Sequence, residues 1–211
     1  MTGTAKTLTG QALSDLWEFD LPPNNPLDLL DQWLRRAEAS DVREPRALTL
    51  ATSSGEGRLT TRVVLLKDTT PQGILFGSSQ HSTKGRSLAL HPQAAGTLYW
   101  PEILQQINLA GCVRLRTDAA ADAAFAARDR WAQAVAWTSQ QSETLEDEQQ
   151  LREEVARLAG SDDPLPRPPH WSLYEVVIDE IEFWSGSTDR LHRRLRFQLE
   201  HGSWTSRRLQ P

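Results

Sequence analysis

The sequence has 211 residues, 38% hydrophobic and 24% charged, which suits one compact domain or one domain with a small appendage. Its formal net charge of -5 argues against a general nucleic-acid binder, and its one cysteine, Cys112, excludes an intramolecular disulfide and any multi-cysteine metal site. No apolar run is long enough for a membrane span, and the polar N-terminus does not resemble a signal peptide. We therefore expect a cytoplasmic protein without a metal.

The N-terminal residues 1–25 show no hydrophobic periodicity and end in Leu-Pro-Pro-Asn-Asn. We predict an arm that lies on the surface or on a partner, followed by a single folded domain at 26–211. Pro26 can occupy the first position of a helix. Apolar residues then recur at helical spacing and predict an amphipathic core helix: Leu29, Leu30, Trp33, Leu34 and Ala37.

From residue 47 the apolar pattern changes to a period of two, which is typical of β-strands. Along residues 59–67, Arg62 faces one side while Val63, Leu65 and Lys67 face the other. Ser82 is placed to cap a short helix that ends before Pro92. The pattern predicts strands at 47–52, 59–67, 73–78, 94–100 and 106–116 and a helix at 82–90, which suggests a small antiparallel barrel.

The C-terminal half contains two helical segments, a proline-rich linker and three further strands. The first of these strands can bend at Asp179 and Glu180, and the last two form a hairpin around His201 and Gly202. The fold class is therefore mainly β, of the α+β type, with peripheral helices. The predicted bounds are helices at 118–131 and 143–158, a linker at 161–169, and strands at 174–184, 195–199 and 204–209.

The stretch from Trp184 to Arg196, W-S-G-S-T-D-R-L-H-R-R-L-R, holds a tryptophan, a histidine and four arginines. So dense a cationic cluster in an acidic chain indicates a site for an anionic ligand. The alternative is a solvated turn between two strands, with arginines that add solubility, and this stretch alone does not decide between them. If the segment is extended, Arg190 and His192 project to the same side.

A second cationic group combines Arg62 and Lys67 with the helix start at residues 82–84. A helix N-terminus offers free N–H groups and a partial positive charge, which suit a phosphate. No P-loop or G-x-G-x-x-G is present, which excludes a nucleoside triphosphate or Rossmann site. Taken alone, Arg62 and Lys67 fit equally a role as solubilising charges on an edge strand.

A third group is rich in amides, which can bind the carbonyl and N–H edge of a heterocycle. The alternative is that these residues are ordinary surface polar groups. The group consists of Gln105, Gln106, Gln140, Gln141 and Ser142.

Seven motifs occur in one order along residues 24–211, and together they are far more specific than any one alone. They are Arg62-x-Val-Leu-Leu-Lys67, Thr83-Lys-Gly85, Tyr99-Trp-Pro101, Gln141-Ser142, Pro166-Arg-Pro-Pro169, Glu182-Phe-Trp184 and Arg190-Leu-His192. The pattern resembles the pyridoxamine 5′-phosphate oxidase family of FMN-dependent proteins. The resemblance implies an FMN-binding split β-barrel that forms a homodimer, with each flavin site between two subunits.

The resemblance also implies roles for individual residues. The FMN phosphate would be held by Arg62 and Lys84, with Ser78 nearby. The substrate would contact Lys67, Arg128, Arg190 and His192, of which Arg190 and His192 would be catalytic. The full set of expected cofactor residues is Arg62, Val63, Leu65, Lys67, Gly77, Ser78, Lys84, Gln106, Gln141, Ser142, Trp184 and Arg194.

Some residues depart from the vitamin B6 oxidases of this family, which hold the substrate phosphate partly through a tyrosine and a serine. Ala124 stands at the tyrosine position and the serine position falls near Ala132. One FMN-phosphate arginine is also missing, because the helix start has Thr83 in its place. Losing a hydroxyl donor to a buried anion costs about 1–3 kcal/mol.

The flavin oxidases of phenazine biosynthesis are similar in further stretches and also tend to lack that tyrosine, whereas Lys67 is more typical of the vitamin B6 oxidases. The shared stretches are Leu8-Thr-Gly10, Arg43-Glu-Pro-Arg-Ala-Leu48, Gln105-Gln-Ile107, Gln141-Ser-Glu-Thr-Leu145 and Arg208-Leu-Gln-Pro211.

We therefore expect an FMN-dependent oxidase that dehydrogenates a reduced phenazine carboxylic acid with O2. The alternative is a pyridoxine/pyridoxamine 5′-phosphate oxidase, and a second alternative is a non-catalytic flavin binder. Arg190 and His192 argue against the last, because a carrier needs no polar groups over the flavin. The expected partners are a small aromatic carboxylate or phosphate, O2 and a second copy of the chain, with no nucleic acid and no membrane.

Overall fold

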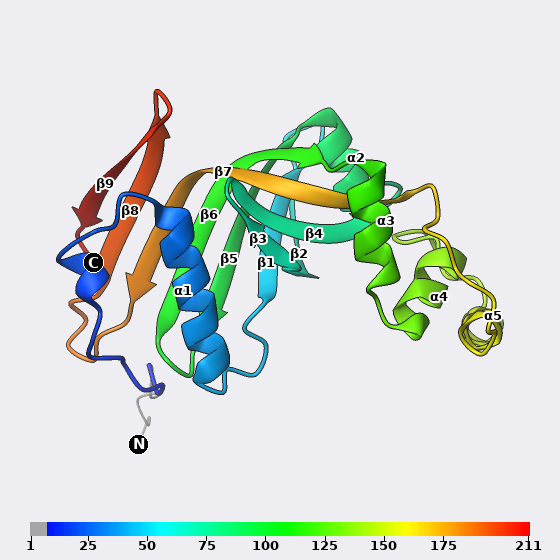
Figure 1. The fold of residues 1–211 in the computed structure, drawn as a ribbon, viewed down its shortest axis with the longest axis horizontal. Coiled ribbons are helices and arrows are strands. Elements are labelled where there is room, and N and C mark those ends of the chain that lie inside the picture. Colours follow the sequence, from blue (N-terminus) through cyan, green and yellow to red (C-terminus); the bar gives the residue numbers. More distant parts are fainter. Residues whose placement is uncertain (1–7) are drawn as a thin grey trace, which may run out of the picture.

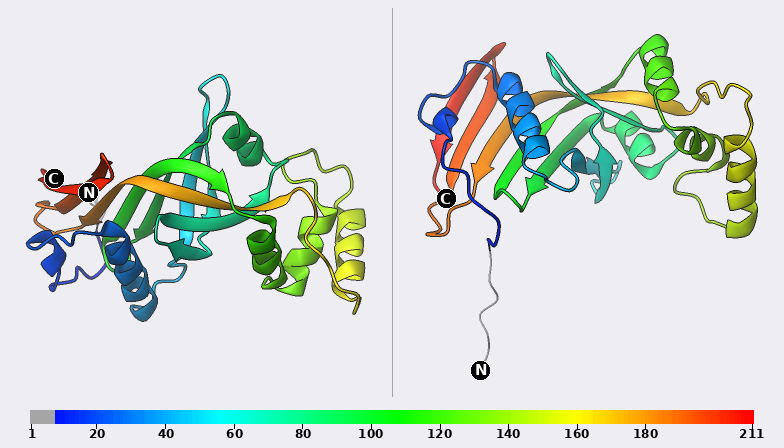
Figure 2. Two further views of the ribbon diagram at one scale, coloured as in Figure 1. Left: turned by 45° about the horizontal axis from the view of Figure 1, so that its top comes forward. Right: turned by 60° about the horizontal axis from the view of Figure 1, so that its bottom comes forward.

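The computed structural model describes residues 8–211, and an antiparallel sheet of nine strands dominates that part of the chain. Seven strands follow the order β2-β1-β5-β6-β7-β4-β3, and β8 and β9 continue the sheet from β7. The sheet curves, with α1 lying across it near the β8–β9 end and α3, α4 and α5 gathered at the other end (Figures 1 and 2). The strands are β1 (Ala47–Ser53), β2 (Leu59–Leu65), β3 (Asp68–Thr70), β4 (Gly73–Ser79), β5 (Gln93–Trp100), β6 (Gln105–Leu115), β7 (Trp171–Ser185), β8 (Arg193–Glu200) and β9 (Ser203–Leu209).

The longest strand, β7, joins the two ends of the molecule. Its first part pairs with β4 up to Val177, and its last part pairs with β8 from Glu180 onward. Its register with β6 shifts between Ala110 and Gly111, which leaves Asp179 as an extra residue. A β-bulge of this kind bends a strand, and it lies where the sequence predicted a bend.

The helices are η1 (Trp17–Phe19), α1 (Pro26–Ala39), α2 (Thr83–Leu90), α3 (Asp118–Ala126), α4 (Arg130–Thr138) and α5 (Glu148–Ala159). The predicted apolar face of α1 is buried in the main core against the sheet. Trp33 meets the ring of Phe183 edge-on at 5.1 Å between centroids. The interpretation of α1 as an amphipathic core helix is confirmed.

Part of the N-terminal arm is anchored in the fold, and residues 1–7 lie outside the described residues. Glu18 and Phe19 are buried. The Glu18 carboxylate accepts hydrogen bonds from Trp33 Nε1 at 2.6 Å and Arg36 at 3.1 Å. The guanidinium groups of Arg193 and Arg208 contact the Phe19 ring. A segment without periodicity thus holds α1 and the C-terminal strands together.

The helical end differs most from the sequence prediction. The expected helix at 118–131 is two helices, because the chain breaks at Arg128 and Asp129 caps α4 by accepting a hydrogen bond from Ala132 N. The helix predicted from residue 143 begins only at Glu148, after the cap Asp147. β3 and most of α4 were not predicted, and β7 begins at Trp171 rather than at 174.

Candidate active site

Two basic side chains meet at the start of α2. Arg62 projects from β2, and its guanidinium donates to Thr52 Oγ1 at 2.8 Å and to Thr60 Oγ1 at 2.6 Å. Lys84, in the first turn of α2, is only 7% exposed and donates to Ser82 Oγ at 3.1 Å. Ser82 itself caps the helix by accepting from Gly85 N.

The charges in this group repel each other and are poorly hydrated. Burial, and then the charge of Arg62, lower the pKa of Lys84 to about 8. Burial also lowers the pKa of Arg62. Among the described residues, no carboxylate forms an ion pair with either side chain.

Two partly desolvated cations beside the N-terminus of a helix fit an anionic group such as a phosphate. We call Arg62, Ser78, Lys84 and the start of α2 the cationic cradle.

The cradle opens into a pocket of about 560 Å³ between β2, β4, α2, α4 and the loop that follows α4. Gln141 from that loop accepts hydrogen bonds from Ser78 Oγ and Lys84 Nζ, both at 3.3 Å. Ser142, which has a positive φ of 82°, accepts from Thr83 N at 3.2 Å. The pocket brings together nine residues that the sequence predicted: Arg62, Val63, Leu65, Gly77, Ser78, Lys84, Arg128, Gln141 and Ser142.

Other lining residues were not predicted, because only tertiary contacts bring them to the pocket. The apolar part of the wall comes from Val135 and Ala136 of α4 and from Trp171 at the start of β7. The indole ring lies so close to Gly77 that a Cβ at that glycine would come within 2.3 Å of it. Gly77 pairs with Leu173, so Trp171 reaches it diagonally across the two strands, and this arrangement is a weak signal in a single sequence.

Arg128 and Lys67 form a second cationic pair at the pocket. Arg128 lines it, whereas Lys67, just beyond the end of β2, does not. Burial lowers the pKa of Arg128. Burial, and then the charge of Arg128, lower the pKa of Lys67. The two positive charges therefore lie near enough to each other to interact.

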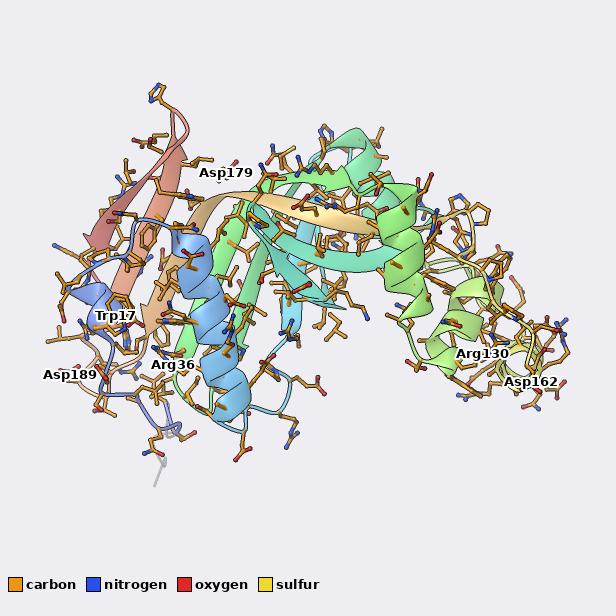
Figure 3. All side chains as sticks on the ribbon, in the orientation of Figure 1. Trp17, Arg36, Arg130, Asp162, Asp179 and Asp189 are labelled. Atoms are coloured by element: carbon orange, nitrogen blue, oxygen red, sulfur yellow. The ribbon has the colours of Figure 1, made fainter. Side chains whose placement is uncertain are left out.

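The remaining predicted residues lie at the other end of the molecule. Gln106 is in register with Trp184, and Trp184 with Arg194, across β6, β7 and β8. The His192 ring is 5.0 Å from the Trp184 ring. Figure 3 shows Asp189, from the loop before His192, at the opposite end of the molecule from Arg130, which is two residues after Arg128. We call Gln106, Trp184, Arg190, His192 and Arg194 the far-end group.

Two side chains of the far-end group, those of Arg194 and His192, already interact with other residues of the same chain. Arg194 forms a two-point ion pair with Glu182, at 2.8 and 3.0 Å, which raises the pKa of Arg194. Ser187 N donates to His192 Nδ1 at 3.1 Å. Neutral His192 therefore carries its proton on Nε2, so it can donate a hydrogen bond to a ligand but is a poor base there.

Two expectations need correction. Arg190 lies in a turn with φ of 70°, so the segment 190–192 is not extended and the argument that both side chains project to one side fails. The amide-rich group also separates: Gln105 is fully buried on the core side of β6, and its amide has no hydrogen-bond partner among the described residues. Gln106 lies on the other face of that strand because side chains alternate.

Comparisons with known proteins identify the family. Residues 35–161 match the family described as pyridoxamine 5′-phosphate oxidase, and residues 171–211 match the pyridoxine 5′-phosphate oxidase C-terminal dimerisation region. The chain belongs to the pyridoxamine 5′-phosphate oxidase family. Its members are FMN-binding oxidases, which confirms FMN as the cofactor and the split barrel as the fold. The chain is therefore an FMN-dependent oxidoreductase with a dimerisation region.

Within this family the chain is similar to members of both subgroups. It is 41% identical over 209 residues to dihydrophenazinedicarboxylate synthase of Pseudomonas chlororaphis, covering 99% of this chain and 94% of the relative. It is 40% identical over 190 residues to pyridoxine/pyridoxamine 5′-phosphate oxidase of Mannheimia succiniciproducens, covering 89% and 90%. The crystal structure of PhzG from Burkholderia lata in complex with tetrahydrophenazine-1-carboxylic acid has a TM-score of 0.93 and 38% identity, covering 96% of this chain and all of the other.

The geometry of the pocket suits FMN. The cationic cradle suits its phosphate, and Gln141 and Ser142 border the adjoining space. In the described part of the chain, no cluster of three or more acidic, histidine or cysteine side chains could hold a metal ion. None of the helices described here has the length and apolarity needed to cross a membrane.

Proposed function

We propose that this protein oxidises a reduced, partly saturated phenazine carboxylic acid with O2. The observation that carries the proposal is Arg128, which lines the pocket and whose charge interacts with that of Lys67. Where the vitamin B6 oxidases have a tyrosine and a serine, the resemblance puts Ala124 and the neighbourhood of Ala132, which offer no hydroxyl. A carboxylate needs fewer donors than a phosphate dianion. A relative with 38% identity whose structure contains tetrahydrophenazine-1-carboxylic acid supports this choice of substrate class.

The complete site needs a homodimer. The far-end group is remote from the pocket of its own chain, and Figure 1 places β8 at the opposite end from α3 and α4. In the proposed homodimer the far-end group of one chain lies at the pocket of the other, and two-fold symmetry then gives two such sites. The match of residues 171–211 to a dimerisation region supports this arrangement.

The protein's part in the reaction is binding and electrostatics. When bound, FMN supplies the redox chemistry: the substrate loses a hydride and a proton, and O2 takes up two electrons and two protons to form H2O2. Arg62, Ser78 and Lys84 hold the cofactor phosphate. Lys67 and Arg128 pair with the substrate carboxylate, and Arg190 of the second chain holds the anionic substrate in the orientation from which the hydride leaves.

His192 acts as an orienting donor in this scheme. Its Nδ1 accepts from Ser187 N, so its Nε2–H is directed away from that loop and can hold a polar atom of the substrate. The proton released by the substrate therefore passes to water or to another group rather than to His192 Nε2.

The competing function is oxidation of pyridoxine 5′-phosphate, which the presence of Lys67 and Arg128 favours. One experiment distinguishes the two functions. FMN-loaded protein is mixed without oxygen with either tetrahydrophenazine-1-carboxylic acid or pyridoxine 5′-phosphate, and reduction of the flavin is followed by its visible absorbance. We expect fast reduction by the phenazine and slow reduction by the phosphate ester. Equal rates, or faster reduction by the phosphate ester, would overturn this ranking, and no reduction by either would favour a non-catalytic flavin binder.

A further inference from the structure

The break between α3 and α4 places Arg128 at the pocket. α3 ends at Ala126 and α4 begins at Arg130, so Arg128 stands in a junction of three residues. A continuous helix would carry its side chains in fixed steps of about 100° and would give residue 128 a different direction. Contacts from other residues hold this short junction in one conformation.

Gln133 fixes the backbone of the junction. Its side chain is 9% exposed, and its Nε2 donates to the carbonyl oxygens of Phe125, Ala126 and Arg128, each at 3.2 Å. Carbonyls at the end of a helix lack their usual partner within the helix, and leaving them buried and unpaired is costly. Phe125 O also accepts a hydrogen bond from Arg128 N at 3.1 Å. One amide group thus serves the end of α3 and the carbonyl of Arg128 itself.

Trp171 fixes the side chain. The guanidinium carbon of Arg128 lies 5.5 Å from the centroid of the indole ring, within the range of a cation–π contact. Trp171 is 3% exposed, and its ring stands edge-on to Phe125 at 5.3 Å and lies against Gly77. One guanidinium nitrogen of Arg128 donates to Ala132 O at 3.2 Å.

No carboxylate of the described residues forms an ion pair with Arg128, and its buried Nε has no hydrogen-bond partner. Contacts with an aromatic ring and one carbonyl hold the group in place without neutralising it. Its charge therefore stays available to an anion in the pocket.

We propose that Gln133 and Trp171 are positioning residues that hold Arg128 in the orientation that binds the substrate carboxylate. The inference rests on the proposed function, because it takes Arg128 as the carboxylate-binding group. It goes further by naming two residues that affect substrate binding through Arg128, of which Trp171 also forms part of the pocket wall. A guanidinium held in place in advance loses little conformational entropy when the ligand binds.

The test is a double-mutant cycle that measures binding rather than turnover. The FMN-loaded protein is titrated with phenazine-1-carboxylate, an oxidised ligand, and Kd is obtained by calorimetry for Gln133→Leu, Arg128→Ala and the double variant. We expect Arg128→Ala to weaken binding about tenfold or more and Gln133→Leu to weaken it about 3- to 10-fold, with FMN content unchanged. In the Arg128→Ala background, Gln133→Leu should have no further effect.

Substitutions of Trp171 provide a second, independent test, which holds even if the Gln133→Leu variant does not fold. Trp171→Phe keeps a flat ring and should weaken binding less than Trp171→Leu, and neither should matter once Arg128 is alanine. The matched controls are Gln150→Leu and Trp131→Phe, which change exposed side chains of the same types in α5 and α4. Both controls should bind as the unaltered protein does.

The possible results distinguish the positioning role of Gln133 and Trp171 from the binding of the substrate carboxylate by Arg128. If Arg128→Ala weakens binding but the Gln133 and Trp171 variants do not, or if their losses persist unchanged in the Arg128→Ala background, the positioning role is wrong and the carboxylate site stands. If Arg128→Ala itself binds normally, the carboxylate site is wrong and the positioning role falls with it.

Discussion

The cationic cradle and the far-end group differ in how far one chain completes them. In the cradle, Arg62 and Lys84 converge on one point, are largely withdrawn from water and lack a carboxylate partner among the described residues. In the far-end group, Arg194 is already paired with Glu182, and the loop carrying Arg190 borders no part of the pocket in its own chain. We therefore expect one chain to suffice for the cofactor phosphate and the substrate to need a second chain.

The largest effect should come from emptying the cradle. Arg62→Ala combined with Lys84→Ala removes two charge-assisted contacts, each worth about 1.5–3 kcal/mol, so Kd for FMN should rise roughly 10²- to 10⁴-fold. Equilibrium dialysis of apoprotein against FMN measures this. The control Arg58→Ala, in the exposed turn before β2, should bind FMN normally. A double variant that retains FMN would show that the phosphate binds elsewhere.

The next largest effect should come from substitutions in the far-end group, which should not release the cofactor. Arg190→Ala should lower the rate of flavin reduction by the substrate about 10- to 150-fold, because a charged contact to the substrate is lost, with FMN content unchanged. His192→Ala should lower it less, since a neutral donor contributes less. Stopped-flow absorbance measures both rates. Loss of flavin or of the dimer with normal activity per flavin would make the pair structural.

The sequence predicts some residues of the pocket and not others. Local rules placed Arg62 on a strand and Lys84 just after the Ser82 cap of a helix, and the family resemblance then assigned Arg62, Val63, Leu65 and Lys84 to one cofactor site. Trp171, Val135 and Ala136 reach the pocket only through the pairing of β4 with β7 and the break at Arg128, which no local pattern specifies. The turn at Arg190 uses a positive φ without a glycine, so the sequence carried no warning of it.

A pH effect should mark the cradle. The pKa of Lys84 is lowered to about 8 without cofactor, and a bound phosphate dianion should raise it again. Below pH 8 Lys84 is already protonated, so the affinity for FMN should be flat from about pH 7, where the phosphate is a dianion. Above pH 8 binding must take up a proton, so Kd should rise, by at most about tenfold per pH unit. Lys84→Arg stays charged and should lose this rise; a rise that persists in Lys84→Arg would assign it to another group.

The smallest effect concerns the choice of anion. Ala132→Ser returns one hydroxyl to the substrate end and should raise kcat/KM for pyridoxine 5′-phosphate about 2- to 10-fold, since a neutral hydrogen bond contributes about 0.5–1.5 kcal/mol. Steady-state oxygen uptake measures it. The matched control is Ala126→Ser, on an exposed face of α3, which should change nothing. An unchanged kcat/KM in Ala132→Ser would mean that residue 132 does not face the substrate anion.

Mixed dimers test most directly whether each site is built from two chains. One chain carries Arg62→Ala with Lys84→Ala, the other carries Arg190→Ala with His192→Ala, and each is expected to be inactive alone. When the two are co-expressed and pair at random, half of the dimers are mixed, and in each of these one site combines an intact cradle with an intact far-end group. We predict that the mixture recovers about a quarter of the flavin-reduction activity of the unaltered protein. A mixture that forms dimers but stays as inactive as its components would contradict the shared site.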